Sequence, residues 1–144
     1  MKRALVAGML LTAVAAVAVT ATASAGAGTE TVYAPKDCTK PKVEPKSITL
    51  ACADAGIYLN RLSWENWGED KVTGAGILRV KTCKPTCVAG PTKSYDANVS
   101  LLKAKRTRCG GRTVLMYNRI HLRFPNKKPR NAKDLRSERL SCNQ

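Results

Sequence analysis

The sequence predicts a small all-β protein, a disulfide-stapled antiparallel sandwich or barrel with little helix. Short runs in which apolar and polar residues alternate recur along the chain, and turn residues such as Gly, Pro and Asn separate them. Six cysteines in 144 residues are typical of small exported domains that rely on disulfides. A set of roughly five or six short strands, each with one buried and one solvated face, accounts for both observations.

The first 25 residues have the pattern of a secretion signal. Lys2 and Arg3 give a positive start, an apolar run follows at 4–19, and Ala23–Ala25 is a small-residue exit of the kind that signal peptidases cut. We therefore expect 1–25 to be a signal peptide and the protein to be secreted and extracellular. Retention of the apolar run as a membrane anchor is the alternative. No later segment approaches the ~20 apolar residues of a transmembrane span, so we expect none after cleavage.

Residues 26–45 are rich in Thr, Pro, Lys and Gly, which predicts an irregular lead-in held at Cys38. The β domain should follow over 46–125. Glycines at 68, 74 and 76 indicate an interruption between its strands. The expected strands cover 48–52, 57–64, 77–83, 95–101 and 113–124.

The segment 113–124 alternates with a period of two, so it should present two different faces. A turn signal at 109–112 precedes it, and Pro125 ends it. We expect an apolar face of Val114, Met116, Ile120, Leu122 and Phe124, and an opposite face of Leu115, Tyr117, Arg119, His121 and Arg123.

Residues 126–144 should form a basic C-terminal tail. Asn131 is placed to cap a short helix, with Asp134 three residues later. The apolar face of that helix would be thin, with little besides Leu135 and Leu140, and isolated helices this short are marginal. We therefore expect little regular structure here.

The cysteines should form three disulfides, because an exported chain of this size uses them to support a modest core. Fifteen pairings are possible, and the sequence does not choose among them. Cys142 lies close to the C-terminus, so its disulfide should hold the tail. A zinc site at Cys83-Lys-Pro-Thr-Cys87 is the alternative, but no second matching pair exists, and we expect no metal. The six residues are Cys38, Cys52, Cys83, Cys87, Cys109 and Cys142.

The positive charge is concentrated in the last third of the chain. Residues 26–102 carry ten basic and eight acidic side chains, whereas 103–144 carry thirteen basic and two acidic ones. A surface of one sign attracts polyanions such as teichoic acid, nucleic acid, acidic polysaccharide or an anionic membrane. A solvated surface that only keeps the protein soluble is the alternative. The expected polyanion-binding residues are Lys103, Lys105, Arg106, Arg108, Arg119, Arg123, Lys127, Lys128, Arg130, Lys133, Arg136 and Arg139.

Both tryptophans lie in the short segment Trp64-Glu-Asn-Trp67. Residues three apart on a strand point to opposite faces, so one ring should lie in the core and the other near the surface, unless the chain turns. Core packing at the end of a strand is one interpretation. The other is an aromatic platform for a sugar ring or a partner, formed by Trp64 and Trp67.

Four ordered motifs resemble a group of small exported actinobacterial proteins of mostly unassigned function. They are Cys52-Ala-Asp-Ala, Trp64-Glu-Asn-Trp67-Gly, Gly74-Ala-Gly76 and Cys83-Lys-Pro-Thr-Cys87-Val-Ala-Gly90. The resemblance covers about 48–124 and excludes Cys38, Cys142 and the basic tail. It implies a secreted bacterial protein and adds no mechanism.

Two enzyme interpretations depend on His121, the one histidine of the chain. A Ser-His-Asp hydrolase would need it, but no Gly-x-Ser-x-Gly elbow is present. A small secreted ribonuclease would combine His121 with Arg119, Arg123 and Tyr117 on one strand face and with Glu65 as a base. The sequence does not place Glu65 near the histidine.

These observations favour a secreted binding protein over an enzyme, with no catalytic residue and no cofactor. The expected partner is an extracellular anionic polymer or the cell-envelope surface, with nucleic acid bound only non-specifically. A secreted protease inhibitor is the first alternative, because Cys83 and Cys87 would brace an exposed loop. A small secreted ribonuclease is the second.

Overall fold

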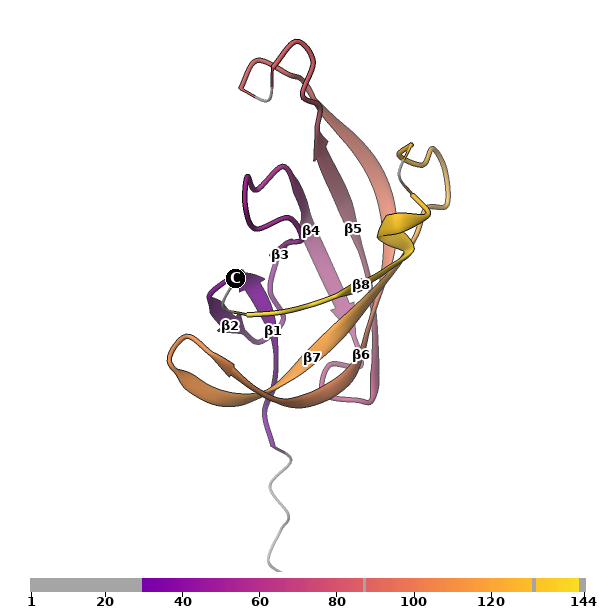
Figure 1. The fold of residues 1–144 in the computed structure, drawn as a ribbon. Coiled ribbons are helices and arrows are strands. Elements are labelled where there is room, and N and C mark those ends of the chain that lie inside the picture. The colour runs from indigo at the N-terminus through magenta and orange to yellow at the C-terminus, as the bar shows by residue number, and fades with distance from the viewer. Residues whose placement is uncertain (1–29, 87, 131, 143–144) are drawn as a thin grey trace, which may run out of the picture.

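The computed structural model describes residues 30–86, 88–130 and 132–142, which form one sheet of eight strands (Figure 1). The order is β2-β1-β7-β6-β5-β4-β3, and β8 pairs with β7 outside this path. In the described residues there is no α-helix, so the all-β prediction is confirmed. The elements are β1 (Val32–Asp37), β2 (Lys40–Lys42), β3 (Ser47–Thr49), β4 (Ile57–Glu65), β5 (Lys71–Lys81), β6 (Thr92–Cys109), β7 (Arg112–Arg123), the 3-10 turn η1 (Asp134–Arg136) and β8 (Ser137–Arg139).

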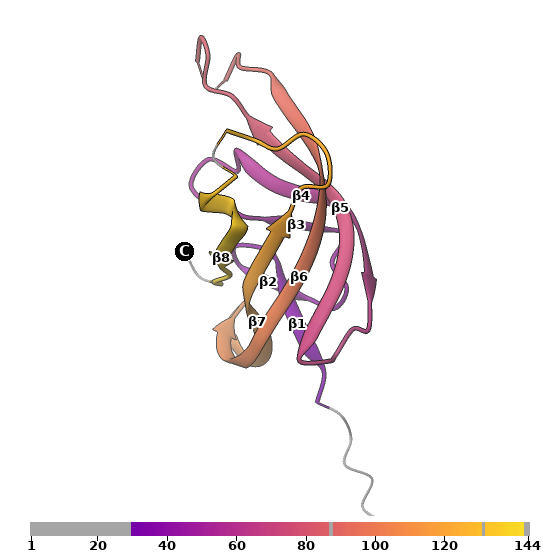
Figure 2. The same ribbon diagram turned by 90° about the vertical axis from the view of Figure 1, so that its right-hand side faces the viewer.

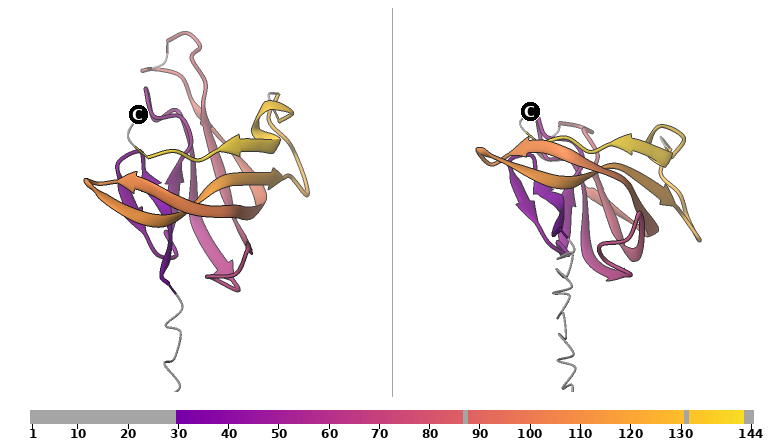
Figure 3. Two further views of the ribbon diagram at one scale, coloured as in Figure 1. Left: turned by 60° about the horizontal axis from the view of Figure 1, so that its bottom comes forward. Right: turned by 90° about the horizontal axis from the view of Figure 1, so that it is seen from below.

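The sheet curls into a half-barrel around one main core, as the end-on view shows (Figure 3). Strands β4 to β7 form an antiparallel meander, whereas β1 joins β7 in parallel, so the sheet is mixed. The curl brings β1 into contact with β3 at the opposite end of the strand order. Cys38 follows β1 and Cys52 follows β3, and the disulfide between them links these two ends covalently.

The segment 26–45, expected to be irregular, contains two strands where it is described. In β1, Val32 and Ala34 are buried in the main core. Asp37 ends the strand: its Oδ1 accepts hydrogen bonds from the amides of Thr39 and Lys40 at 3.0 and 2.9 Å, which turns the chain into β2. The Pro and Lys residues that indicated a loop are tolerated because β2 lies at the edge of the sheet.

The C-terminal tail is also part of the fold rather than a loose extension. Its strand β8 pairs with β7, and the Leu140 amide donates to the Asn118 carbonyl at 2.9 Å. Leu135 and Leu140, the two residues of the thin apolar face, are both buried in the main core. Cys142 is bonded to Cys109, which holds the chain end as expected. Asn131, the proposed cap, lies outside the described residues.

The expected strands are present with other bounds: β4, β5 and β6 are longer than predicted, β7 is shifted by one residue, and β3 is shorter than the expected 48–52. β5 runs through Gly74 and Gly76, which we expected to interrupt the sheet. Both glycines instead permit close packing, because a β-carbon at Gly74 would collide with the Ser63 carbonyl and the Trp64 ring, and one at Gly76 with Leu62. The 95–101 strand extends over the whole of β6, and the turn at 109–112 is a two-residue hairpin with glycines at positive φ.

The two faces of β7 differ from the expected alternation. Lys103 on the paired strand has φ +57°, and the register continues around it from Leu102 to Ala104. Between this irregularity and the turn at 110–111, the opposite face of the β6–β7 hairpin packs against the main core. Tyr117, which we assigned to the wetter face, is therefore fully buried in that core, and Met116 belongs to a second cluster with the Cys109–Cys142 disulfide.

The disulfides are compatible with an oxidising environment such as the extracellular space. Cys83 is disulfide-bonded as well, whereas Cys87 lies outside the described residues. Because its sulfur is already bonded, Cys83 does not supply the thiolate that the zinc alternative needs. In the described part of the chain, no helix has the length and apolar character needed to cross a membrane.

Candidate anion-binding surface

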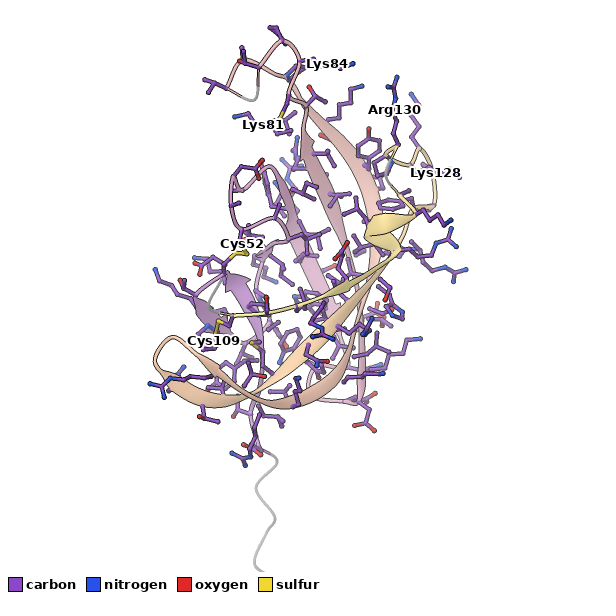
Figure 4. The ribbon with its side chains drawn as sticks, viewed as in Figure 1. Cys52, Lys81, Lys84, Cys109, Lys128 and Arg130 are labelled. Atoms are coloured by element: carbon purple, nitrogen blue, oxygen red, sulfur yellow. A yellow bond between two sulfur atoms is a disulfide. The ribbon has the colours of Figure 1, made fainter. Side chains whose placement is uncertain are left out.

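The structure separates the expected polyanion-binding residues into three groups. Lys103, Lys105, Arg106 and Arg108 lie on the outer part of β6, toward the hairpin end where Cys109 is labelled in Figure 4. The 124–136 connection carries the second group at the opposite end of the molecule, where Figure 4 labels Lys128 and Arg130. Its members are Lys127, Lys128, Arg130, Lys133 and Arg136. The third group lies on strands β7 and β8 and consists of Arg119, Arg123 and Arg139.

The hairpin group is partly neutralised within the protein. Arg106 forms an ion pair with Glu30, with its Nη2 2.9 Å from the carboxylate. Arg112, at the end of the same hairpin, lies over the Tyr33 ring with 5.5 Å between the guanidinium carbon and the ring centroid. Arg108 also has an interaction partner. Of the four members of this group, Arg106 therefore has its charge paired within the protein.

The strand group is arranged in register but spread over a convex surface. Arg119 lies opposite Arg139, and its Nη1 donates to Ser137 Oγ at 3.2 Å. Arg123 is the last residue of β7 and lies opposite Asn98. Because the sheet curls around its core, side chains on its solvent face diverge. Arg119 and Arg139 therefore do not converge with Arg123, which instead lines a hollow together with Lys128 and Arg136.

The second group borders a groove made of three adjoining hollows. The first, of about 400 Å³, is lined by Lys84, Lys93 and Arg130, among others. The second, of about 530 Å³, shares Lys93 and adds Lys127 and Lys128. The third, of about 340 Å³, shares Lys128 and is lined also by Arg123, Phe124 and Arg136. We call this surface the cationic groove and define it by Lys84, Lys93, Lys127, Lys128 and Arg130.

All five residues of the cationic groove are exposed. Among the described residues, none of the five has an ion pair or a side-chain hydrogen bond. Asp96 is the carboxylate on the neighbouring part of β6, and its Oδ2 already accepts a hydrogen bond from Asn126 Nδ2 at 3.0 Å. A hydrogen bond from a neutral amide leaves the Asp96 carboxylate charged, so one negative charge lies beside the five positive ones. The groove therefore has an excess of positive charge around a concave surface, which is the arrangement that attracts an anionic ligand.

Sequence reasoning missed Lys84 and Lys93, which belong to the nearly neutral part of the chain. The β5–β6 hairpin carries them beyond the rest of the sheet (Figures 1 and 2), where the 124–136 connection faces them. The turn at 83–87 and the two flanking strands could have indicated that the two lysines are close. No sequence signal indicated that Lys128 and Arg130 would join them.

Hydrogen bonds hold the hairpin end in shape. The Thr82 amide donates to the Pro91 carbonyl at 3.0 Å, and the Gly90 amide donates to the Thr86 carbonyl at 2.8 Å. Gly90 lies so close to the Thr82 carbonyl that a β-carbon would not fit. These bonds join residues 82 and 86, on either side of Lys84, to residues 91 and 90, which precede Lys93.

Trp64 and Trp67 have the contacts of core residues. Their rings meet edge to face at 5.3 Å between centroids, and Trp67 meets Tyr117 in the same way at 5.6 Å. Each indole N–H donates to a backbone carbonyl, from Trp64 to Pro45 at 2.8 Å and from Trp67 to Val32 at 3.0 Å. Both rings are half-buried against the main core. This geometry favours core packing over an exposed aromatic platform.

The residues of the ribonuclease alternative are not assembled in one place. Tyr117 is buried, and its hydroxyl donates to the Glu69 carbonyl at 2.7 Å. Glu65 and His121 lie in one cross-strand row but three strands apart, which is ~14 Å between their Cα atoms on the convex face. A general base and acid must both reach one substrate at hydrogen-bond distance.

One observation is consistent with the protease-inhibitor alternative, namely that the loop between β5 and β6 is exposed. Lys84 and Thr86 are exposed in the connection between β5 and β6, and Val88 is 90% exposed. No further feature of the loop identifies a reactive site. Among the described residues, no group of His, Cys, Asp or Glu is placed to hold a metal ion.

Comparison with protein-family models, with curated proteins and with solved structures finds no match to this chain. The resemblance to small exported actinobacterial proteins therefore stays a prediction.

Proposed function

We propose that this protein is a secreted, non-enzymatic binding protein that holds an extracellular anionic polymer in its cationic groove. The observation that carries the proposal is the convergence of five exposed cationic side chains around connected hollows. They come from two segments far apart in sequence and have no carboxylate partner among the described residues. The hairpin group, in contrast, is partly paired internally.

A polymer suits this groove better than a small compact anion. The three hollows adjoin each other through Lys93 and Lys128, so the charges follow an elongated path rather than a single pocket. A flexible chain with regularly spaced negative groups can contact several of these cations at once. Each exposed contact is weak, and the sum of several gives useful affinity that is sensitive to salt.

The test compares two variants of equal net charge. In the groove variant, Lys84, Lys93, Lys128 and Arg130 are replaced by Gln. In the control variant the same replacement is made at four exposed lysines away from the groove, Lys40, Lys42, Lys103 and Lys105.

Binding of inorganic polyphosphate and of a glycerol-phosphate polymer is measured across a salt series. We expect the groove variant to lose about tenfold or more in affinity and to show a shallower salt dependence, because several ion contacts are removed. The control variant should lose much less. Equal losses in the two variants would mean that overall charge, not the groove, holds the polymer.

A further inference from the structure

Strand β6 has a strand on only one side along its first third. β5 pairs with β6 from Lys71 opposite Leu102 to Lys81 opposite Thr92. β7 pairs with the other edge of β6 only from Asn98 onward. Within the described part of the chain, residues 92–97 therefore have no strand on that second edge.

The backbone groups on this open edge can be identified from the register. The Thr82 amide donates to the Pro91 carbonyl at 3.0 Å, so residue 91 points toward β5. In an antiparallel ladder, alternate residues bond to the same neighbour. The amides and carbonyls of Thr92, Ser94 and Asp96 therefore point away from β5, toward the open edge.

The cationic groove lies directly on this edge. The largest of its hollows is lined by Lys93, Ser94 and Tyr95 of β6 together with Lys127 and Lys128 of the facing connection. The connection approaches β6 at Asp96, where Asn126 donates its hydrogen bond. Backbone hydrogen-bonding groups and lysine side chains thus border the same space.

We propose that the ligand of the cationic groove is an extended acidic polypeptide that adds to the sheet along Thr92–Asp96. Its backbone would pair with the open amides and carbonyls, as in other cases of strand addition. Its carboxylates would contact Lys93, Lys128 and Arg130. This inference depends on the proposed function, since it names the polymer that occupies the same groove.

The geometry also predicts the pattern of the ligand. Side chains of an added strand alternate between the two faces of the sheet. Lys93 shares the inward face of β6 with Tyr95, which packs against the main core. A peptide with an acidic residue at every second position would place all its carboxylates on the face that carries the groove.

The experiment uses four probes with the intact, disulfide-bonded protein. The first is a ten-residue peptide in which Glu and Thr alternate, and the second has the same composition with the Glu residues in adjacent pairs. The third is the alternating peptide with every second amide methylated, on the edge that would face β6. The fourth is inorganic polyphosphate. Affinity is measured by calorimetry, and hydrogen exchange is followed at the amides of Ser94 and Asp96.

We expect the alternating peptide to bind about tenfold more tightly than the paired and methylated peptides, because it alone forms the backbone bonds with its charges on one face. It should slow exchange at Ser94 and Asp96, which polyphosphate should not. Three peptides of equal affinity, with polyphosphate bound as well, would overturn strand addition and leave the proposed function standing. No binding by any of the four probes would overturn both, and the lysines would then only protect the strand edge from aggregation.

A protein variant gives an independent test of the same edge. Ser94→Pro removes the amide that points to the open edge while leaving the ladder to β5 intact, since proline is tolerated at such edge positions. Its matched control is Ser94→Ala, which keeps the amide but removes the hydroxyl that accepts a hydrogen bond from Arg79 Nη1 at 2.7 Å. We expect Ser94→Pro to weaken the alternating peptide about tenfold and leave polyphosphate binding unchanged. Equal peptide binding by the two variants would contradict the proposal.

Discussion

The two described disulfides should contribute different amounts to stability because they close loops of different length. Cys38–Cys52 spans 14 residues and Cys109–Cys142 spans 33. In the chain-entropy model these loops correspond to about 3.0 and 3.7 kcal/mol at 25 °C. Burial adds to the difference, because Cys109 and Cys142 are buried in the second cluster, whereas Cys38 and Cys52 are half-buried.

The measurement is urea unfolding of two double variants, Cys38→Ala with Cys52→Ala and Cys109→Ala with Cys142→Ala. The fluorescence of the half-buried tryptophan pair reports loss of the core. We expect the second variant to be the less stable by about 1 kcal/mol, the loop-length difference plus a small packing loss. Alanine is preferred to serine because the second cluster is apolar.

The opposite order would refute this reasoning. Cys38–Cys52 links the β1 and β3 ends of the curled sheet, which have no shared ladder in the described strand order. If removal of this shorter loop costs more than removal of the longer one, closure of the half-barrel stabilises the protein more than unfolded-state entropy does. Equal losses would also contradict the loop-length argument.

Three further predictions concern buried or closely packed residues. Burial raises the pKa of Tyr117, so the folded state keeps the phenolic proton to higher pH than the unfolded state does. The free energy of unfolding should therefore fall as pH rises above about 10. Tyr117→Phe should remove that dependence, as measured by unfolding at a series of pH values. Partial burial acts to raise the pKa of Asp37, but hydrogen bonds from Thr39 and Lys40 outweigh it and lower that pKa; stability should fall as pH drops below about 4, and less steeply in Asp37→Asn. Gly74→Ala places a β-carbon against the Ser63 carbonyl oxygen and 2.7 Å from the Trp64 ring, so thermal unfolding should show a loss of about 1–3 kcal/mol.

Local patterns predicted the central strands well because each of those strands has one dry and one wet face. The predicted alternation is kept at Ala97, Val99 and Leu101 of β6 and at Ile120 and Leu122 of β7, and the two glycines at 110–111 mark the hairpin between these strands. The pattern does not show where a strand changes face. Tyr117 lies beyond such a change, because Lys103 on the neighbouring strand takes up a left-handed backbone conformation. The backbone conformation of Lys103 on β6 thus affects which face of β7 carries Tyr117.

The two segments expected to be irregular form strands for a shared physical reason. β1 and β8 both pair with β7, one along 115–116 and the other along 119–121. Neither segment has enough alternating apolar residues to predict a strand by itself. The hydrogen-bonding edge of β7 and the disulfides at Cys38 and Cys142 supply the order that local sequence lacks.

The candidate site also depends on strand pairing that the local sequence does not show. The charge asymmetry led us to expect Lys127, Lys128 and Arg130 among the polyanion-binding residues, but it treated the basic residues of 103–144 as one surface. The fold divides that surface. β6 and β7 place the hairpin group at one end of the molecule and the 124–136 connection, which leads to β8, at the other end. Lys93 joins the groove only through the long β5–β6 register, and the same register leaves the edge of β6 open beside it. Charge density along the chain therefore locates a region, whereas strand register determines which cations meet and which backbone groups they meet beside. A ligand of this groove should match both the positions of the cations and the open backbone groups of β6. The alternating and paired peptides have equal charge and differ only in spacing, so comparing them tests this directly.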